Sequence, residues 1–412
     1  MAAGYDVVIA GAGPAGAQCA RDLAARDYDV LVLETESEDE FPRQSNKSTA
    51  GTFPRMMAAF NIPDRVVQHF TDKVVLESPN DHYVQEQAGA VLDFAKLKRF
   101  LVEEGRERGA EYRFDARVAG PILDENDEIV GVRYNGDEEV NGQIMIDATG
   151  PGAHLARPLG VTDLQRQNQA IGIEFEYEGV EPDHPEYADC RDAMMLRLDH
   201  NLAPGGYSWL FHTGEDTAKV GLCYIQNESY RHNADPSMTV DNYLDYWLDT
   251  DPRFANATRI EGKQSHRGSA HIQPPGNMSA ANFMAIGDTV PSIDPVWGEG
   301  IHQCMKSARA AAMVADSCLT PSTPDTSAEA MATYKQLWHE EVAPTHDARL
   351  FMTRLLYLAS NARYDRLMRD MRNLDTDTLA TINQGNRLAI RKLVHLSDLP
   401  LLARFGKMHF TS

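Results

Sequence analysis

The sequence predicts an α/β protein in which a dinucleotide-binding domain is combined with a mixed β-sheet domain and a helical C-terminal region. Three observations support this prediction. A glycine-rich turn links an apolar strand to a helix near residue 11, a second strand–loop–helix segment with glycines lies near residue 287, and several strand-like segments lie within 166–269. At 412 residues the chain exceeds one typical core, so more than one domain is expected.

The first element is a Rossmann-like βαβ unit with the dinucleotide-binding fingerprint. Residues 5–10, YDVVIA, are apolar and rich in β-branched residues, which predicts a buried parallel strand. The turn GAGPAG, a helix and a strand over 29–34 follow. We expect the turn and the helix N-terminus to bind a pyrophosphate and the acid that ends the second strand to accept ribose hydroxyls. The expected cofactor contacts here are Gly11, Gly13, Ala15, Gly16 and Glu34.

A second cofactor-binding segment begins at residue 282. The stretch NFMAIGD predicts a strand that ends at Gly287 and Asp288, and Gly298 and Gly300 open a long alanine-rich helix. Asp288 is expected to hold a ribityl hydroxyl, and the amides of Gly300 and Ile301 to face an isoalloxazine ring. Because two helix N-termini far apart in the sequence would each hold one end of the cofactor, we predict FAD rather than NAD. Residues 142–150, GQIMIDATG, predict a further strand of the same domain.

The stretch YSWLFH at 207–212 gathers three rings and an imidazole in a chain that is only 8% aromatic. In a strand, Tyr207, Trp209 and Phe211 share one face, and Ser208, Leu210 and His212 share the other. Two interpretations stay open. The rings either pack into a core, since aromatic residues are common in strands, or form a wall against a flat or apolar ligand.

Composition restricts the class of protein further. The formal net charge is -22, and the basic residues are 10 lysines and 29 arginines. Such an acidic surface repels nucleic acid, so no nucleic-acid partner is expected, and it indicates a protein built for high salt, where self-repulsion is screened. The five cysteines are scattered and contain no CxxC pair, so no metal site is expected.

The chain contains no apolar run of 18 residues, and it enters its first strand within a few residues, which predicts a cytoplasmic protein. Its charge is uneven. Residues 345–412 carry 11 Lys and Arg against 6 Asp and Glu, and include the apolar clusters RLLYLAS and DLPLLARFGKMHF. This basic C-terminal region either touches an anionic membrane surface peripherally or packs its apolar face on the body of the protein.

These segments together resemble the FAD-binding fold shared by aromatic-ring hydroxylases, flavin halogenases and geranylgeranyl reductases. Residues 287–301 are similar to the GDxxxxxxPxxGEGI motif of the whole group. Geranylgeranyl reductases carry a YxWxFP motif, which Tyr207, Trp209 and Phe211 match, with His212 at the family's proline. The WxWxIP motif of flavin halogenases fits less well. Over about residues 5–345, the chain therefore resembles the geranylgeranyl reductase family in its archaeal digeranylgeranylglycerophospholipid reductase branch.

The resemblance implies an FAD-dependent reductase that saturates isoprenoid double bonds of membrane lipid precursors. Tyr207, Trp209 and Phe211 would line a tunnel for a polyprenyl lipid. An external electron donor (ferredoxin, quinol or NAD(P)H) is expected, because the chain has no second GxGxxG turn and no cysteine motif. His212 is a weak candidate for the proton donor, because strand alternation turns it away from the Trp209 face.

Three other functions stay open at this point. A flavin monooxygenase or halogenase would use oxygen, and a halogenase would need a tunnel lysine, for which Lys47 and Lys73 are the early candidates. A non-redox polyprenyl cyclase of the lycopene type would use FAD structurally. A nucleotide-binding module would perform no chemistry.

The chain departs from the family pattern at two places. Where the family has a Lys-x-Cys-Gly-Gly-like segment, the chain reads NKSTAGTF, with Thr49 for the cysteine and Ala50 for its glycine. Thr49 cannot act as a redox thiol but can hydrogen-bond the flavin. Phe94 replaces the family's FAD-contacting arginine, and Arg99 or Arg43 is expected to substitute.

The expected domains follow from these segments. The FAD-binding domain covers 1–165 and returns at 270–322. It includes a helix over 94–108, a β-meander over 111–147 with a hairpin at Asn135 and Gly136, and a short excursion into the substrate domain near 73–90. The substrate domain, 166–269, is expected to hold a four-stranded sheet over the flavin, and 323–412 a helical C-terminal domain.

Overall fold

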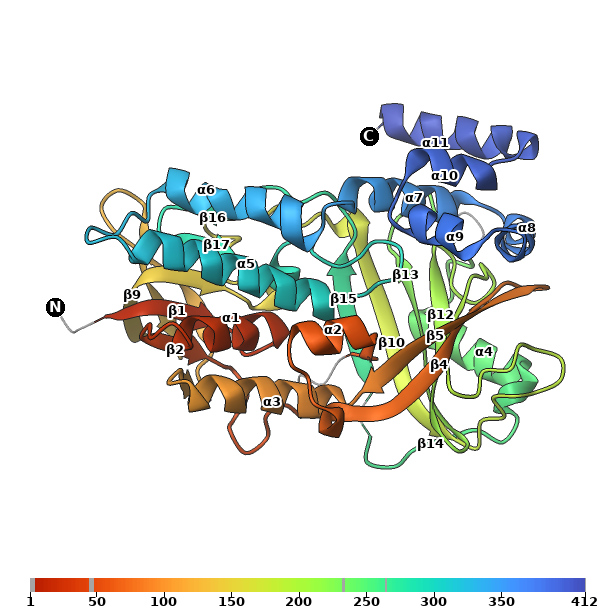
Figure 1. Ribbon diagram of the computed structural model, residues 1–412, viewed down its shortest axis with the longest axis horizontal. Helices are drawn as coiled ribbons and strands as arrows, with labels where there is room; N and C mark the ends of the chain where they lie inside the picture. The colour runs from red at the N-terminus through yellow and green to blue at the C-terminus, as the bar shows by residue number, and fades with distance from the viewer. Residues whose placement is uncertain (1–3, 44–47, 232–233, 264, 412) are drawn as a thin grey trace. The chain divides into compact units, whose positions relative to one another are not determined.

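The computed structural model describes residues 4–43, 48–231, 234–263 and 265–411, and the chain forms two compact units (Figure 1). The first unit comprises Met1–Asn46, Phe94–Gln165 and Gln273–His346, and the second comprises Lys47–Asp93, Arg166–Ile272 and Asp347–Ser412. Each unit has its own β-sheet.

The sheet of the first unit has the main strand order β16-β17-β9-β1-β2-β6. Its central pairings, β1 with β2 and β9, β9 with β17, and β2 with β6, are all parallel. The buried, β-branched run of β1 explains its central position. The expected strands near 5, 29, 142 and 282 are confirmed. The strands are β1 (Tyr5–Ala10), β2 (Val30–Leu33), β6 (Glu111–Arg113), β9 (Glu138–Asp147), β16 (Ser279–Ala280) and β17 (Phe283–Ala285).

Three helices pack side by side over this sheet (Figure 1). The middle one, α1 (Pro14–Ala24), contacts both α3 (Phe94–Glu107) and α5 (Ile301–Leu319). The apolar face expected for α3 is confirmed, because Phe94, Leu97 and Leu101 are all buried. A further helix, α6 (Ala328–Leu337), packs on α5.

An antiparallel meander extends the first sheet through β9. β7 (Val118–Leu123) pairs with β8 (Ile129–Tyr134), and β8 pairs with β9. Asn135 and Gly136 connect β8 to β9 with φ angles of 50° and 95°. These positive angles are what a tight hairpin turn requires, so the predicted hairpin is confirmed.

The second unit is built on a larger sheet than the four strands that the sequence analysis expected. Its strand order is β14-β10-β13-β12-β11-β4-β5-β3, and β15 pairs with β10. The four expected strands form the middle of the sheet. Residues 47–93 add three more strands at one end, and two of these, β4 and β5, form a long antiparallel pair. The strands are β3 (Gly51–Thr52), β4 (Val67–Glu77), β5 (His82–Leu92), β10 (Gln169–Glu178), β11 (Ala193–Arg197), β12 (Gly206–Gly214), β13 (Thr217–Ile225), β14 (Thr258–Arg259) and β15 (His266–His271).

One face of this sheet forms the core of the second unit. Leu210, Val220 and Leu222 are completely buried in a cluster with Tyr243 and Trp247. The latter two come from α4 (Val240–Thr250), which packs on β10 and β13. The face that carries Leu210 is therefore the core face.

The C-terminal region is divided between the two units rather than forming a domain of its own. Residues 323–346, with α6, belong to the first unit, and residues 347–412 belong to the second. Packing decides this division, since α6 lies on α5 whereas α8 lies on β5. The remaining helices are α2 (Pro54–Ala59), α7 (His346–Leu358), α8 (Asn361–Arg372), α9 (Thr376–Asn383), α10 (Arg387–Ile390) and α11 (Leu399–Thr411).

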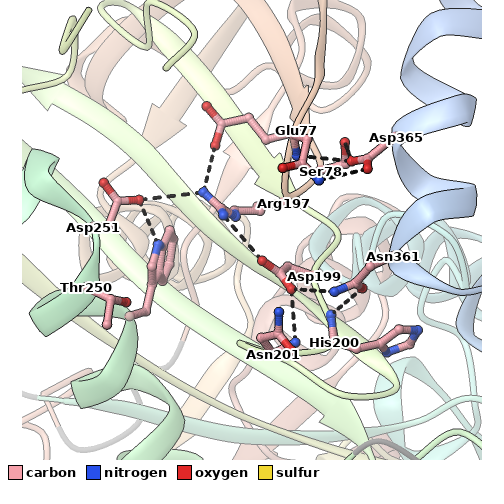
Figure 2. Close-up of polar contacts among 12 residues, drawn as sticks. Glu77, Ser78, Arg197, Asp199, His200, Asn201, Thr250, Asp251, Asn361 and Asp365 are labelled. Carbon is pink, nitrogen blue, oxygen red and sulfur yellow. Dashed lines mark hydrogen bonds and ion pairs between the residues drawn. The ribbon is translucent and has the colours of Figure 1, made fainter. Parts of the chain in front are cut away.

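A network of buried charges joins the strand ends of the second unit to α8 (Figure 2). Arg197, at the end of β11, contacts Glu77, Asp199 and Asp251 at 3.3 to 3.7 Å. Asn361, at the start of α8, donates to Asp199 at 3.0 Å. The network anchors the first C-terminal helices on the sheet of this unit.

Candidate functional site

The glycines of the first turn have different roles. A Cβ at Gly16 would lie 1.9 Å from the carbonyl oxygen of Gly11, and one at Gly11 would lie 2.7 Å from that of Ala148. These two glycines are therefore required by the fold itself. A Cβ at Gly13 would meet nothing within 4 Å. Gly13 leaves open space at the start of α1, where the fingerprint predicts a pyrophosphate.

Glu34 is held at the edge of the same turn. Its Oε2 accepts from the amide of Ala12 at 2.8 Å and its Oε1 from the amide of Glu36 at 3.0 Å. The side chain is 9% exposed. Each carboxylate oxygen keeps a second acceptor site, so Glu34 retains the capacity to accept from ribose hydroxyls.

The first unit presents two helix N-termini without side-chain caps. Gly13 caps α1 and Gly300 caps α5, neither cap makes a side-chain hydrogen bond, and neither helix has an acid in its first turn. The helices pack against each other although their starts are about 290 residues apart. Helix N-termini without side-chain caps or acidic residues favour anionic or electron-rich ligand groups, so this pair of termini fits a two-ended cofactor such as FAD.

The loop before α5 is fixed by Asp294. Its Oδ1 accepts from the amides of Val296 and Trp297 at 3.0 and 2.9 Å. Gly298 follows with a φ of 65°, a conformation that favours glycine. The loop therefore leads directly into α5, whose N-terminus has no side-chain cap.

Asp288 lies beside this loop, and no cation of the described residues is paired with its carboxyl. Burial raises the pKa of its carboxyl to about 6, and only a contact with Cys304 lowers it. Burial therefore disfavours the charged carboxylate and extends the neutral acid up to about pH 6. A ligand hydroxyl that donated to this carboxylate would stabilise the charged form instead.

Asp288→Asn is therefore expected to stabilise the FAD-free protein by about 1–3 kcal/mol above pH 6 and hardly at all near pH 4. A raised carboxyl pKa favours folding below the unfolded pKa, and this contribution disappears as pH rises through the folded pKa. Urea unfolding in molar KCl at several pH values would measure the difference between variant and wild type. A difference that does not change with pH would contradict this prediction.

The two arginines expected near the cofactor are exposed. Arg99 donates from Nε to the carbonyl of Phe41 at 3.3 Å and is largely exposed, as is Arg43. Phe94 is buried. The buried cation of α3 is Lys98, whose Nζ lies 4.7 Å from the ring centre of Phe41. Sequence reasoning did not identify Lys98, and the substitution of Arg99 or Arg43 for the family's arginine stays a prediction.

In the second unit, the alternation of β12 separates a buried core face from a half-buried face. Ser208, Leu210 and His212 are buried, whereas Tyr207, Trp209 and Phe211 are half-buried. The core therefore takes Leu210, and the rings form the opposite face. Of the two interpretations of YSWLFH, this arrangement favours the aromatic wall. We call Tyr207, Trp209 and Phe211 the aromatic row.

A cross-strand line of residues continues from the aromatic row. Trp209 is paired with Gly221, Gly221 with Glu174, and Glu174 with His266. Because directly paired residues project from the same face of a sheet, these residues share the face of the rings. A Cβ at Gly221 would lie 2.5 Å from Cζ2 of Trp209, so glycine is what allows the indole to reach across β13.

Glu174 is the centre of this line. Its Oε2 accepts from Nε1 of Trp209 at 2.7 Å and from the Thr49 hydroxyl, and its Oε1 contacts Nδ1 of His266 at 2.7 Å. The side chain is 2% exposed. Burial alone would raise the pKa of Glu174. His266, Thr49 and the nearby Lys219 lower it by a larger amount, so the net pKa lies below the usual value. Glu174 is an ionised, fully bonded carboxylate.

The segment that carries Thr49 lies over the same face. Nζ of Lys219, 2% exposed, donates to the carbonyl of Thr49 at 3.0 Å. A Cβ at Gly51 would lie 2.5 Å from the ring of Phe211. Ala50 has a φ of 58°, which explains why a glycine suits this position. The structure thus brings Thr49 to the aromatic row, although the two are about 160 residues apart.

His212 is occupied by backbone groups on the core face. Its Nδ1 accepts from the amide of Asp192 at 3.0 Å, and its Nε2 lies 2.9 Å from the carbonyl of Glu215. His69 lies 2.7 Å from the Asp192 carboxylate. These three side chains form the one potential metal-ligand group of the described residues, but the lone pair of Nδ1 faces an N–H. Both ring nitrogens of His212 thus contact backbone groups, which indicates a structural role, and we do not propose His212 as the proton donor.

Sequence reasoning missed Glu174, His266 and Lys219. In AIGIEFEYEG the acids alternate with apolar residues, and this pattern is typical of a solvent-facing strand side. Only the glycine at 221, unusual inside a strand, hints that a neighbouring side chain crosses there.

Comparison with known proteins identifies the class first. The family model described as FAD dependent oxidoreductase matches residues 6–172, and the model described as geranylgeranyl reductase catalytic domain matches 182–264. The fold is that of a geranylgeranyl bacteriochlorophyll reductase-like protein from Thermoplasma acidophilum, with a TM-score of 0.81, 21% identity, and coverage of 94% of this chain and 98% of that one. A flavin-dependent brominase shares it less closely, with a TM-score of 0.72, 20% identity, and coverage of 93% and 94%. The protein is an FAD-dependent oxidoreductase.

The particular family follows from closer relatives. The digeranylgeranylglycerophospholipid reductase of Haloferax volcanii is 63% identical over all 412 residues and is covered completely. Digeranylgeranylglycerophospholipid reductase 2 of Methanopyrus kandleri is 27% identical over 408 residues, 98% of each chain. The chain belongs to the digeranylgeranylglycerophospholipid reductase family. Its acidic, salt-adapted composition agrees with the Haloferax relative.

Proposed function

We propose that the protein uses reduced FAD to saturate the geranylgeranyl chains of a membrane phospholipid precursor. The observation that carries this proposal is the aromatic row, three half-buried rings on the sheet face opposite the core. Rings of this kind provide apolar contact area for an isoprenoid chain. The flavin supplies hydride chemistry when bound, and the protein binds and orients the alkene and excludes water.

The oxygen-dependent alternative has little support among the described residues. Lys73, one of the two lysines considered for a halogenase tunnel, lies 3.4 Å from the Asp189 carboxylate and is 16% exposed. Lys47, the other, lies outside the described residues. We propose an external electron donor (ferredoxin, quinol or NAD(P)H), because the sequence holds one dinucleotide-binding turn.

The proposed function is tested by the reoxidation of the flavin without oxygen. FAD-loaded protein in molar KCl is reduced with dithionite, and a geranylgeranylated phospholipid is added anaerobically. We expect the flavin absorbance to return with this lipid and not with its fully saturated counterpart. Trp209→Ala should slow the reaction, whereas Phe70→Ala, an exposed ring in the same unit, should not. Equal rates with both lipids would refute the proposal.

The basic C-terminal region supports a peripheral membrane contact. None of the helices that the structure describes is both long and apolar enough to span a bilayer. Residues 388–402 expose several apolar side chains next to the exposed Arg391 and Lys392. The exposed side chains are Leu388 (72%), Val394 (44%), Leu396 (86%), Leu399 (60%) and Leu402 (37%). We propose that this patch docks a cytoplasmic protein on an anionic phospholipid surface.

The double variant Leu388→Glu/Leu396→Glu is expected to lower binding to anionic phospholipid vesicles at least about ten-fold, because each buried leucine contributes about 1.5–3 kcal/mol. Vesicle cosedimentation in high salt measures the apolar part of the binding. Leu123→Glu, an exposed leucine of the first unit, is the matched control and should bind as wild type. Equal loss in the control would contradict a localised patch.

A further inference from the structure

His266 and Glu174 form a hydrogen-bonded pair on the sheet face that carries the aromatic row. The two residues are directly paired across β15 and β10, and Nδ1 of His266 lies 2.7 Å from Oε1 of Glu174. His266 is 7% exposed and Glu174 is 2% exposed. Among the residues that the structure describes, Nε2 of His266 has no hydrogen-bond partner.

A buried carboxylate that accepts from one imidazole nitrogen fixes the tautomer and the orientation of the ring. The second nitrogen is then available to transfer a proton. Glu174 is ionised, so Nδ1 is the donating nitrogen of the pair. This leaves Nε2 as the nitrogen that can exchange a proton with a substrate.

The pair is tied directly to the proposed substrate surface. The two oxygens of Glu174 contact His266 and Trp209 at 2.7 Å each. One carboxylate thus fixes both the imidazole and the central ring of the aromatic row. Gly221 is the only residue between Trp209 and Glu174 in the cross-strand line, and it has no side chain to separate them.

We propose that His266, oriented by Glu174, donates the proton that the saturation of an isoprenoid double bond requires; this inference rests on the proposed function. When bound, the reduced flavin would supply a hydride to one carbon of the alkene, and the π bond breaks. The other carbon receives the Nε2 proton of His266, and solvent then returns a proton to the imidazole. Glu174 acts as a positioning residue.

Other charged groups lie near this pair. Lys219 on β13 lies near Glu174, and Lys263, before β15, contacts Glu176 at 3.2 Å. The adjacent Arg267 is paired with Asp241 of α4, on the core side of the sheet. His266 therefore contacts Glu174 directly, and the cation Lys219 acts on it only through Glu174.

The test compares His266→Asn and Glu174→Gln with Glu178→Gln, an exposed glutamate on the same strand and the same side. We expect His266→Asn to lower kcat for lipid saturation by about 100-fold, with FAD binding, dithionite reduction and KM nearly unchanged. Glu174→Gln should lower kcat by about 10-fold, and Glu178→Gln should have no effect.

The pH profile separates a proton donor from a structural residue. A protonated imidazole donor makes kcat fall as pH rises and the donor loses its proton, and this alkaline limb should be absent in His266→Asn. Wild-type kcat in His266→Asn with the limb retained would overturn the inference while leaving the proposed function intact. If His266→Asn does not fold, two other results would overturn the inference. One is a pH profile of the wild-type kcat without an alkaline limb, and the other is a fully active Glu174→Gln variant. A wild type that saturates no lipid would remove the proposed function and this inference together.

Discussion

Gly13→Ala is expected to lower the affinity for FAD by about 100-fold while leaving the stability of the FAD-free protein unchanged. A Cβ at this position meets nothing within 4 Å, and the backbone has an ordinary φ of -66°, so the apoprotein accommodates the methyl group. The methyl group would, however, occupy the space in which a pyrophosphate approaches the start of α1. A loss of about 3 kcal/mol of binding free energy corresponds to about 100-fold in Kd.

Titration of the apoprotein with FAD, followed by flavin fluorescence, measures the affinity, and urea unfolding measures the stability. Gly276→Ala is the matched control, since it also meets nothing within 4 Å but lies outside the fingerprint. Gly16→Ala should instead destabilise the fold, because its Cβ would lie 1.9 Å from a carbonyl oxygen. Wild-type affinity in Gly13→Ala would show that the cofactor does not lie at this turn.

Arg253→Met is expected to destabilise the protein by about 3–5 kcal/mol. Arg253 is 0% exposed and binds Glu77 through two contacts of 2.9 Å. It also binds Asp251 at 2.8 and 3.0 Å. Burial raises the pKa of Asp251, yet Arg253 lowers it below its usual value, so the carboxylate is ionised. Removal of the guanidinium would leave two buried carboxylates with Arg197 as the one remaining cation in contact with them among the described residues.

Arg191→Met is the control for this variant. Arg191 also contacts two carboxylates, those of Asp183 and Asp189, but its side chain is 58% exposed. Exposed pairs contribute at most about 1 kcal/mol, and molar salt screens them further. Urea unfolding of both variants in molar KCl gives the comparison. Similar midpoints for the two variants would mean that the buried network is not a major source of stability.

The sequence predicts the cofactor half of the protein well because its signals are local. The run YDVVIA, the glycine turn and the acid at Glu34 lie within about 30 residues, and each follows from the backbone geometry of one βαβ unit. The separation of Tyr207, Trp209 and Phe211 from Leu210 follows equally from strand alternation.

The polar part of the substrate face could not be predicted in this way. Glu174 and His266 are about 90 residues apart, and Thr49 is about 125 residues from Glu174. Only strand pairing brings them together, and pairing register is a long-range property. An acid that alternates with apolar residues normally indicates solvent, whereas here Trp209, Thr49 and His266 satisfy it.

The domain organisation was missed for a similar reason. Residues 323–412 are helical, as expected, but helical content does not reveal which sheet each helix covers. The polar contacts of Asn361 and Asp365 with residues near 199 and 78 decide it for α8, and none of these pairs is visible from sequence spacing.

The most direct test of the central claim is the mass of the lipid product. FAD-loaded protein in molar KCl is reduced anaerobically with dithionite, mixed with a geranylgeranylated phospholipid, and the lipid is extracted for mass spectrometry. We expect mass gains in steps of two hydrogens, one step for each flavin reoxidised, and a loss of these gains in Trp209→Ala while its flavin remains bound. An unchanged lipid mass, with a flavin that reoxidises only when air is admitted, would contradict the assignment of this protein as an isoprenoid reductase.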